Sequence, residues 1–322
     1  MSNYLILGGA GFIGYHLAKY LSANKKNNIE IVDNFSRGKI DQNLKGLIKK
    51  KNIKIRNVDL TNNVKKKFSN KFNYIFNLAA IIGVRNVLKN PKKVLENNFI
   101  LQKNSISIAE KQSNLKKFIF FSTSEVYAGS NYFFKTKIPA SEKTPLTVSS
   151  LESSRSTYML SKIYGEAMCY SSKLPFLILR PHNVYGERMG MDHVIPEILK
   201  KITISKKSQN LKVFTPSHSR SFCYIDDAIK QIVNLSISNK VKQVFNIGND
   251  KDEISIRDVV KLCLKILKKK RKIQSLSGHH NSPPRRCPNM KKTFKNIKRI
   301  KFTTLSQGIE NVYNWYKFNK LI

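Results

Sequence analysis

Two side chains near the middle of the sequence are spaced for acid–base chemistry. In the segment STYMLSK, Tyr158 and Lys162 stand four positions apart in a pattern typical of a helix, so both side chains point from one face. A phenol has an ordinary pKa of about 10 and is a poor base at neutral pH. Because a nearby ammonium stabilises the phenolate, the spacing predicts that Lys162 lowers the pKa of Tyr158 and that Tyr158 acts as a general base.

A glycine-rich segment near the N-terminus has the spacing of a phosphate-binding turn. The sequence GGAGFIG, from Gly8 to Gly14, follows a short apolar run and opens a segment with helical spacing. Glycines at positions 8, 11 and 14 permit a tight turn, a close approach of the backbone to a pyrophosphate, and close packing of a helix on a strand. We therefore expect a dinucleotide to bind here, with Phe12 and Ile13 beside it.

A carboxylate follows at the position that would select the dinucleotide. Asp33 ends the second apolar run, IEIVD, where a carboxylate can accept hydrogen bonds from both hydroxyls of an adenosine ribose. The same charge repels a 2′-phosphate, which favours NAD over NADP. The nearby Arg37 keeps NADP open as the alternative.

Short apolar runs alternate with helix-length segments over the first 180 residues. This alternation predicts an α/β fold with a doubly wound, Rossmann-type parallel sheet. After Pro181 the alternation stops and prolines separate shorter helical pieces, so we expect one domain over residues 1–180 and a smaller C-terminal lobe over 181–322. The apolar run at 244–249 is predicted to return to the main sheet.

Composition excludes several other classes of protein. With 322 residues, 41% of them hydrophobic, the chain can bury a large core, and its longest apolar runs fall far short of the roughly 20 residues that cross a bilayer. No secretory signal is recognisable, so we expect a cytoplasmic protein. The four cysteines form no CxxC pair, which predicts reduced thiols and, with the scattered histidines, no metal site.

The net charge of +39 raises nucleic acid or an anionic membrane as a partner. Of the 59 basic residues 47 are Lys and they are scattered, whereas nucleic-acid sites favour clustered Arg with its fork of donors. The densest basic run, Lys265 to Lys272, is typical of a solvated helix end. We therefore expect neither a nucleic-acid nor a membrane partner, and a positive field that attracts an anionic small substrate.

An ordered set of motifs resembles one enzyme family along essentially the whole chain. They are GGAGFIG, VDN at 32–34, VDL at 58–60, NLAA at 77–80, FSTSEVYA at 121–128, YMLSK, RPHNVYG at 180–186, RSFCYIDD at 220–227, NIGN and PRRCPNM at 284–290. The chain resembles an extended short-chain dehydrogenase/reductase of the NAD-dependent nucleotide-sugar epimerase/dehydratase group. This resemblance implies NAD as cofactor, a nucleotide-diphosphate sugar bound by the C-terminal lobe, and a homodimer formed through a helix bundle.

The resemblance also implies roles for individual residues. Tyr158 would take the proton of the sugar C4 hydroxyl while C4 passes hydride to NAD, Thr123 would bond the same oxygen, and Lys162 would hold the nicotinamide ribose. Residues expected to contact NAD are Gly8, Gly11, Phe12, Ile13, Gly14, Asp33, Asn34, Asp59, Leu60, Leu78, Ala79, Ala80, Tyr158 and Lys162. Residues expected to contact the nucleotide sugar are Asn183, Arg220, Arg285 and Arg286, and the arginines suit a diphosphate.

Glu125 bears on the reaction step after the oxidation at C4. Simple 4-epimerases of the family need no acid or base at this position, whereas a carboxylate here resembles 4,6-dehydratases and UDP-glucuronate decarboxylases. Ser124 stands where the dTDP-glucose dehydratase pattern has Asp. We expect epimerisation or elimination from a transient 4-keto sugar, with Glu125 as a catalytic residue. Decarboxylation of UDP-glucuronate is the alternative, since Glu125 suits proton transfer at C5 and Arg220 could pair with a uronate.

Other interpretations remain open at this point. Glu125 can serve only to fix its loop, because carboxylates often act as structural acceptors. The fold alone is also compatible with a non-catalytic NAD-binding sensor. His182 and His193 lie near the motifs, and we expect both to be structural.

Overall fold

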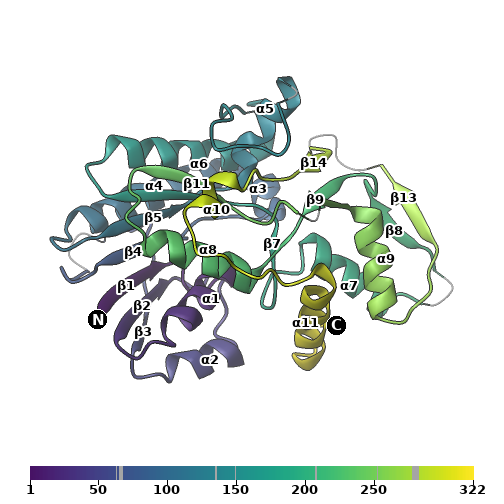
Figure 1. The fold of residues 1–322 in the computed structure, drawn as a ribbon, viewed down its shortest axis with the longest axis horizontal. Helices are drawn as coiled ribbons and strands as arrows, with labels where there is room; N and C mark the ends of the chain where they lie inside the picture. Colours follow the sequence, from purple (N-terminus) through teal and green to yellow (C-terminus); the bar gives the residue numbers. More distant parts are fainter. Residues whose placement is uncertain are drawn as a thin grey trace.

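The computed structural model describes residues 1–62, 64, 68–134, 136–148, 150–206, 209–251, 253–277 and 283–322. Its main body is a twisted sheet with helices on both faces, and a smaller group of helices and strands lies beside it (Figure 1). The predicted α/β fold with a doubly wound parallel sheet is thus confirmed.

The main sheet has seven strands, all paired in parallel, in the order β11-β6-β5-β4-β1-β2-β3. These strands are β1 (Ser2–Leu7), β2 (Asn27–Asp33), β3 (Ile53–Asn57), β4 (Tyr74–Asn77), β5 (Lys117–Phe121), β6 (Phe176–Pro181) and β11 (Gln243–Ile247). The chain reverses its direction of travel across the sheet between β1 and β4. Ligands of doubly wound sheets bind at the carboxyl ends of strands at such a point.

Helices cover both faces of this sheet. One face packs against α1 (Phe12–Leu21) and α8 (Ile225–Ile237), and the other against α4 (Pro91–Glu110) and α6 (Ser154–Ser171). The short helix α3 (Val84–Lys89) packs on α4 and α6, and α2 (Gln42–Ile48) lies beside β3. Alternate side chains of β1 accordingly enter different cores, with Ile6 in one and Leu5 and Leu7 in the other. Burial on both faces explains why the strands appear as continuous apolar runs.

The smaller lobe contains helices and short sheets from the C-terminal part of the chain. Its helices are α7 (Val194–Ile204), α9 (Ile256–Ile266) and α11 (Leu305–Phe318). One of its sheets pairs β8 (Leu211–Phe214) with β13 (Ile273–Leu276). The other has three strands in the order β12 (Glu253–Ser255), β9 (Ser219–Ser221) and β14 (Arg285–Arg286). The remaining elements are a 3₁₀ turn η1 (Ser124–Tyr127), α5 (Ala128–Phe133), α10 (Lys291–Lys295), and β7 (Val184–Tyr185) paired with β10 (Cys223–Tyr224). Because α8 and β11 pack on the main sheet, residues 181–322 contribute to both parts of the molecule.

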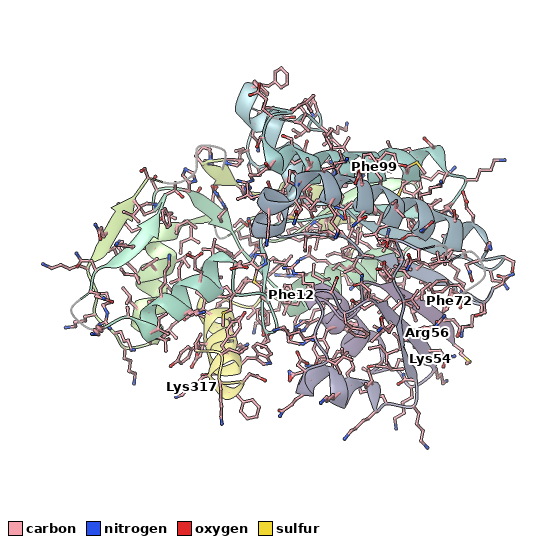
Figure 2. All side chains as sticks on the ribbon, turned by 180° about the vertical axis from the view of Figure 1, so that it is seen from behind. Phe12, Lys54, Arg56, Phe72, Phe99 and Lys317 are labelled. Atoms are coloured by element: carbon pink, nitrogen blue, oxygen red, sulfur yellow. The ribbon has the colours of Figure 1, made fainter. Side chains whose placement is uncertain are left out.

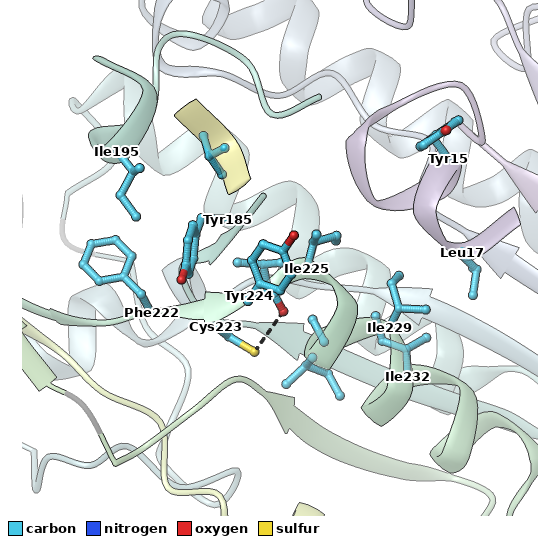
Figure 3. Close-up of a cluster of buried hydrophobic side chains, with 14 of the residues drawn as sticks. Tyr15, Leu17, Tyr185, Ile195, Phe222, Cys223, Tyr224, Ile225, Ile229 and Ile232 are labelled. Carbon is cyan, nitrogen blue, oxygen red and sulfur yellow. Dashed lines mark hydrogen bonds between the residues drawn. The ribbon is translucent and has the colours of Figure 1, made fainter. Parts of the chain in front are cut away.

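A core of aromatic and branched side chains forms where β7, β10 and α8 meet (Figure 3). The rings of Tyr185 and Tyr224 meet edge to face, with their centroids 5.7 Å apart. The buried thiol of Cys223 donates to the Tyr224 carbonyl oxygen at 3.7 Å.

All four cysteines are free and buried. No helix in the described ranges is long and apolar enough to cross a membrane.

A buried ion pair ties the main sheet to α6. Arg180 on β6 and Glu166 on α6 each expose only 4% of their side chains, and Arg180 Nε donates to Glu166 Oε1 at 2.9 Å. Ser122 donates to the same oxygen at 2.5 Å, and Arg180 also donates to the Tyr127 hydroxyl at 2.8 Å. The pair therefore holds both ends of the segment 122–127.

We expect Glu166→Gln to lower the free energy of unfolding by about 3 to 5 kcal/mol, because it leaves the buried Arg180 charge without its partner. Urea unfolding followed by circular dichroism measures the change. The control is Glu197→Gln, which breaks the exposed pair of Glu197 with Lys201 on α7 and should cost less than about 1 kcal/mol. Equal losses in the two variants would contradict a structural role for the buried pair.

Candidate active site

The glycine turn lies between β1 and α1 and leaves no room for side chains. Gly8 has φ of +76°, and a Cβ on it would lie 2.8 Å from the backbone nitrogen of Ala79. A Cβ on Gly14 would lie 2.6 Å from the Gly9 Cα atom. Phe12, at the start of α1, lies near the middle of the molecule (Figure 2). The bare backbone at the start of α1 fits an anionic phosphate, as the sequence suggested.

Asp33 stands at the end of β2, beside this turn. Its carboxylate accepts from the backbone N–H of Ala10 at 3.0 Å and from that of Phe35 at 2.9 Å. Burial raises the pKa of Asp33, although these hydrogen bonds oppose the shift. The carboxylate is fixed at the carboxyl edge of the sheet, where the ribose of a dinucleotide bound to the turn would lie.

The other residues expected to contact the dinucleotide occur along the same edge of the sheet. Leu78, Ala79 and Ala80 follow β4, where the Leu78 N–H donates to the Leu7 carbonyl oxygen at 2.9 Å. Asp59 and Leu60 follow β3, and Asn34 is exposed directly after Asp33. The turn, the fixed carboxylate and these loops together fit NAD, which would supply hydride acceptance and return.

Thr123, Tyr158 and Lys162 come together between β5 and α6. The hydrogen bond from Thr123 lowers the pKa of Tyr158, but burial and the nearby Glu125 carboxylate outweigh it and raise that pKa overall. Lys162 Nζ lies 5.9 Å from the Tyr158 ring centroid and donates to the Phe121 carbonyl oxygen at 2.8 Å. Burial lowers the pKa of Lys162 to about 8, against the opposing effect of Glu166. In this structure the ammonium thus binds the main chain, and Thr123 is the hydrogen-bond partner of the phenol.

Glu125 lies partly buried among arginines, with 20% of its side chain exposed. It forms ion pairs with Arg286 and, at 3.2 Å, with Arg155. Burial alone would raise the pKa of Glu125, but Arg286, Arg155 and Arg220 outweigh it and hold the pKa below its ordinary value. Glu125 is therefore an anion at neutral pH, suited to accept hydrogen bonds and poorly suited to donate a proton.

Two of the predicted substrate arginines face Glu125 because of strand register. Strand β14 pairs with β9 so that Arg286 stands opposite Arg220, which puts both side chains on one face. Burial and the like charges of Arg286 and Arg155 together lower the pKa of Arg220 to about 9, although Glu125 opposes them. Three cations thus gather around one carboxylate.

The other predicted substrate residues have different surroundings. Arg285 alternates to the opposite face, where it forms a bidentate ion pair with Glu253 at 2.7 and 2.9 Å. Asn183 has φ of +41°, and its side-chain amide donates to the Ser221 carbonyl oxygen at 3.0 Å and to the Arg286 carbonyl oxygen at 3.4 Å. Asn183 therefore fixes the two strands that bear the arginines, and Arg285 lies outside the cluster around Glu125.

Arg155 was not predicted from the sequence. It stands three positions before Tyr158 on α6, so helical spacing places both side chains on one face. That three-residue spacing was the signal available in the sequence, but the prediction followed the four-residue spacing of Tyr158 and Lys162 instead.

Within the described ranges, no group of three or more His, Cys, Asp or Glu residues could hold a metal ion.

A phosphate-binding turn at the switch point of a doubly wound sheet, next to a threonine–tyrosine pair, defines a class of dinucleotide-dependent enzymes that oxidise and reduce an alcohol carbon. Residues 4–248 match the model of the NAD dependent epimerase/dehydratase family. The chain belongs to this family of NAD-dependent enzymes that modify nucleotide sugars.

Similar proteins of this family differ in reaction. The UDP-N-acetyl-alpha-D-glucosaminuronate decarboxylase of Bacillus cytotoxicus is 30% identical over 97% of each chain. The dTDP-D-glucose 4,6-dehydratase of Dictyostelium discoideum is 32% identical over 83% of this chain and 62% of its own. The structure of a Bacillus cereus UDP-glucuronic acid 4-epimerase variant, bound to UDP-4-deoxy-4-fluoro-glucuronic acid and NAD, has a TM-score of 0.86 and 26% identity, with 98% of this chain and 99% of that chain covered.

We expect the charge on Glu125 to make stability depend on pH in acid. Because the folded-state pKa is depressed, the ionised carboxylate stabilises the fold above its ordinary pKa of 4.5, and this contribution disappears as pH falls through the folded-state value. Melting temperatures of the wild type and Glu125→Gln should therefore differ by a constant amount above about pH 5.5 and converge below pH 4.5. A difference that does not vary between pH 3 and pH 7 would contradict the ion pairs.

Proposed function

We propose that this protein oxidises C4 of a UDP-linked uronic acid and then decarboxylates the 4-keto sugar. The observation that supports this most directly is the gathering of Arg155, Arg220 and Arg286 around the single carboxylate of Glu125, beside Tyr158. This group has an excess of positive charge in a partly buried position. Such a site favours a substrate with a further anionic group besides its diphosphate.

The state of Glu125 argues against 4,6-dehydration. Elimination of a hydroxyl needs an acid that protonates the leaving oxygen. Arginine contacts keep Glu125 ionised, and Ser124 stands where the dTDP-glucose dehydratase pattern has Asp. Decarboxylation has no such leaving oxygen, so it is the better match to these residues.

The residues around the sugar then have defined tasks. With NAD bound, the positive charge of the nicotinamide ring would favour the phenolate of Tyr158 against the effects of burial and Glu125. Tyr158 then takes the proton of the C4 hydroxyl, Thr123 bonds the same oxygen, and NAD would accept hydride from C4 and later return it. The C4 ketone lies β to the C6 carboxylate, so the C5–C6 bond breaks, carbon dioxide leaves, and the electron pair forms an enolate across C5 and C4. Tyr158 and Thr123 stabilise the enolate oxygen, and C5 takes a proton from water, which restores the ketone. Return of hydride to C4 and of the proton held by Tyr158 to the C4 oxygen then completes the reaction.

Two relatives support a uronate as the substrate class. By their names, the Bacillus cytotoxicus decarboxylase and the Bacillus cereus epimerase both act on uronic acids linked to UDP. The similarity to the epimerase structure also favours a second candidate, 4-epimerisation of a UDP-uronate. That reaction uses Thr123 and Tyr158 but breaks no carbon–carbon bond.

Mass spectrometry of products from a panel of UDP-uronates and neutral nucleotide sugars separates these reactions. We expect loss of carbon dioxide from a UDP-uronate, whereas unchanged mass with altered retention would indicate epimerisation and loss of water would indicate dehydration. Turnover of neutral sugars alone would overturn the proposal. Tyr158→Phe is the matched control, since it should abolish turnover while NAD stays bound. A Tyr158→Phe variant as fast as wild type would contradict the assigned mechanism.

We also propose that the protein forms a homodimer through α4 and α6. The two helices pack against each other, and apolar or aromatic side chains remain exposed on and next to them at Leu88, Ile100 and Tyr170. Phe99, labelled in Figure 2, stacks on Tyr164 with ring centroids 4.1 Å apart. Light scattering should give twice the chain mass of 37.0 kDa, and Ile100→Glu should reduce it to the monomer value. A wild-type monomer would contradict this assembly.

A further inference from the structure

The hydrogen-bonding state of His182 can be derived from its neighbours. His182 follows β6 and is 2% exposed, and its Nε2 atom lies 3.1 Å from Asn246 Oδ1. Asn246 donates its amide hydrogens to the carbonyl oxygens of Ala140 and Asn289, at 3.0 and 3.3 Å. The Tyr127 hydroxyl also donates to Asn246 Oδ1, at 2.9 Å. Because this oxygen only accepts, His182 Nε2 must bear the hydrogen.

The other ring nitrogen is therefore a fixed acceptor. Burial and the Arg286 and Arg180 charges together lower the pKa of His182 to about 3, against the hydrogen bond to Asn246. The ring is neutral at physiological pH, so Nδ1 presents a lone pair. Nδ1 is buried and has no hydrogen-bond partner among the described residues. A buried acceptor without a donor costs free energy, which indicates that this site is built for a ligand with an O–H or N–H group.

A small cavity next to His182 has room for such a ligand. It has a volume of about 10 Å³, and Ser124, Arg286 and Asn131 line it together with His182. That volume accommodates one water molecule. The cavity links the buried histidine to the segment that bears Thr123 and Glu125, because Ser124 lies between these two residues.

We propose that this cavity is a binding site for one water molecule, which donates to His182 Nδ1 and to the Ser124 hydroxyl oxygen and accepts from Arg286. His182 is then a positioning residue that acts through Ser124. With its oxygen engaged by the water, Ser124 directs its own hydrogen to the substrate side, where it donates to an anionic group. The inference rests on the proposed function and deepens it, by giving the uronate carboxylate a neutral donor beside the arginines.

Two substitutions of His182 separate this role from a purely structural one. Asparagine retains a polar atom near the position of Nδ1, whereas glutamine retains one near Nε2 and can keep the bond to Asn246. We expect His182→Asn to keep most of the wild-type kcat/KM and His182→Gln to lose about tenfold, the effect of one lost hydrogen bond. A preserved His182→Gln with a damaged His182→Asn, or equal losses in both, would overturn the proposal.

A double-mutant cycle tests the connection to Ser124. In a Ser124→Ala background, His182→Gln should have no further effect on kcat/KM, because the water then has no hydroxyl to orient. Independent, multiplying losses would overturn the connection. Melting temperatures of all variants identify any loss that is due to unfolding.

Two measurements do not depend on which sugar is turned over. A high-resolution crystal structure of the wild-type protein should show one water within hydrogen-bond distance of both His182 Nδ1 and Ser124 Oγ, and nitrogen NMR should show the neutral ring with its hydrogen on Nε2. A wild-type structure without that water overturns the inference even if decarboxylation is confirmed. If decarboxylation fails but the water and the cycle are found with another nucleotide sugar, the proposed function fails and the water site stands.

Discussion

The buried ion pair between Glu166 and Arg180 is the interaction on which the site geometry depends. It joins α6, which carries Tyr158 and Lys162, to β6, and through Ser122 and Tyr127 it holds the segment that carries Thr123 and Glu125. Isolated buried charges are costly, so the pair requires both partners at fixed positions. An error of one residue in the packing of α6 on the sheet would leave two charges unpaired. This requirement keeps the tyrosine and the threonine within hydrogen-bond distance.

Electrostatics around Glu125 give the site its chemical character. The protein brings three arginines near a single carboxylate, and the low pKa that results makes Glu125 an anion that balances part of their charge. Without Glu125 the arginines would repel one another with little water to screen their charges, and without the arginines the partial burial of Glu125 would favour the protonated acid. The cluster is therefore suited to holding an added anion and poorly suited to donating protons.

The sequence predicted the elements whose signals are local. Alternating apolar runs predicted the parallel sheet, and the glycine spacing predicted the turn that Gly8 and Gly14 form, because these patterns depend on neighbours within a few residues. The cluster around Glu125 was only partly predictable. Its arginines come from α6, β9 and β14, and the register that places Arg286 opposite Arg220 and turns Arg285 away arises from pairing across 66 positions. No local pattern encodes such a pairing.

Relatives that share this fold catalyse different second steps for a chemical reason. Once C4 is a ketone, the C5 proton is acidic and a C6 carboxylate is labile, so the fold does not choose between elimination, epimerisation and decarboxylation. The choice depends on which groups near C5 and C6 can donate or accept protons. In this chain Glu125 is ionised rather than an acid, Ser124 has a neutral hydroxyl, and Ser124 and His182, with its buried acceptor, line the same small cavity. In our proposal, the charge on Glu125 and the hydrogen-bonding groups beside it therefore favour one second step over the others, whereas the parallel sheet and the glycine turn serve the oxidation at C4 that these reactions share.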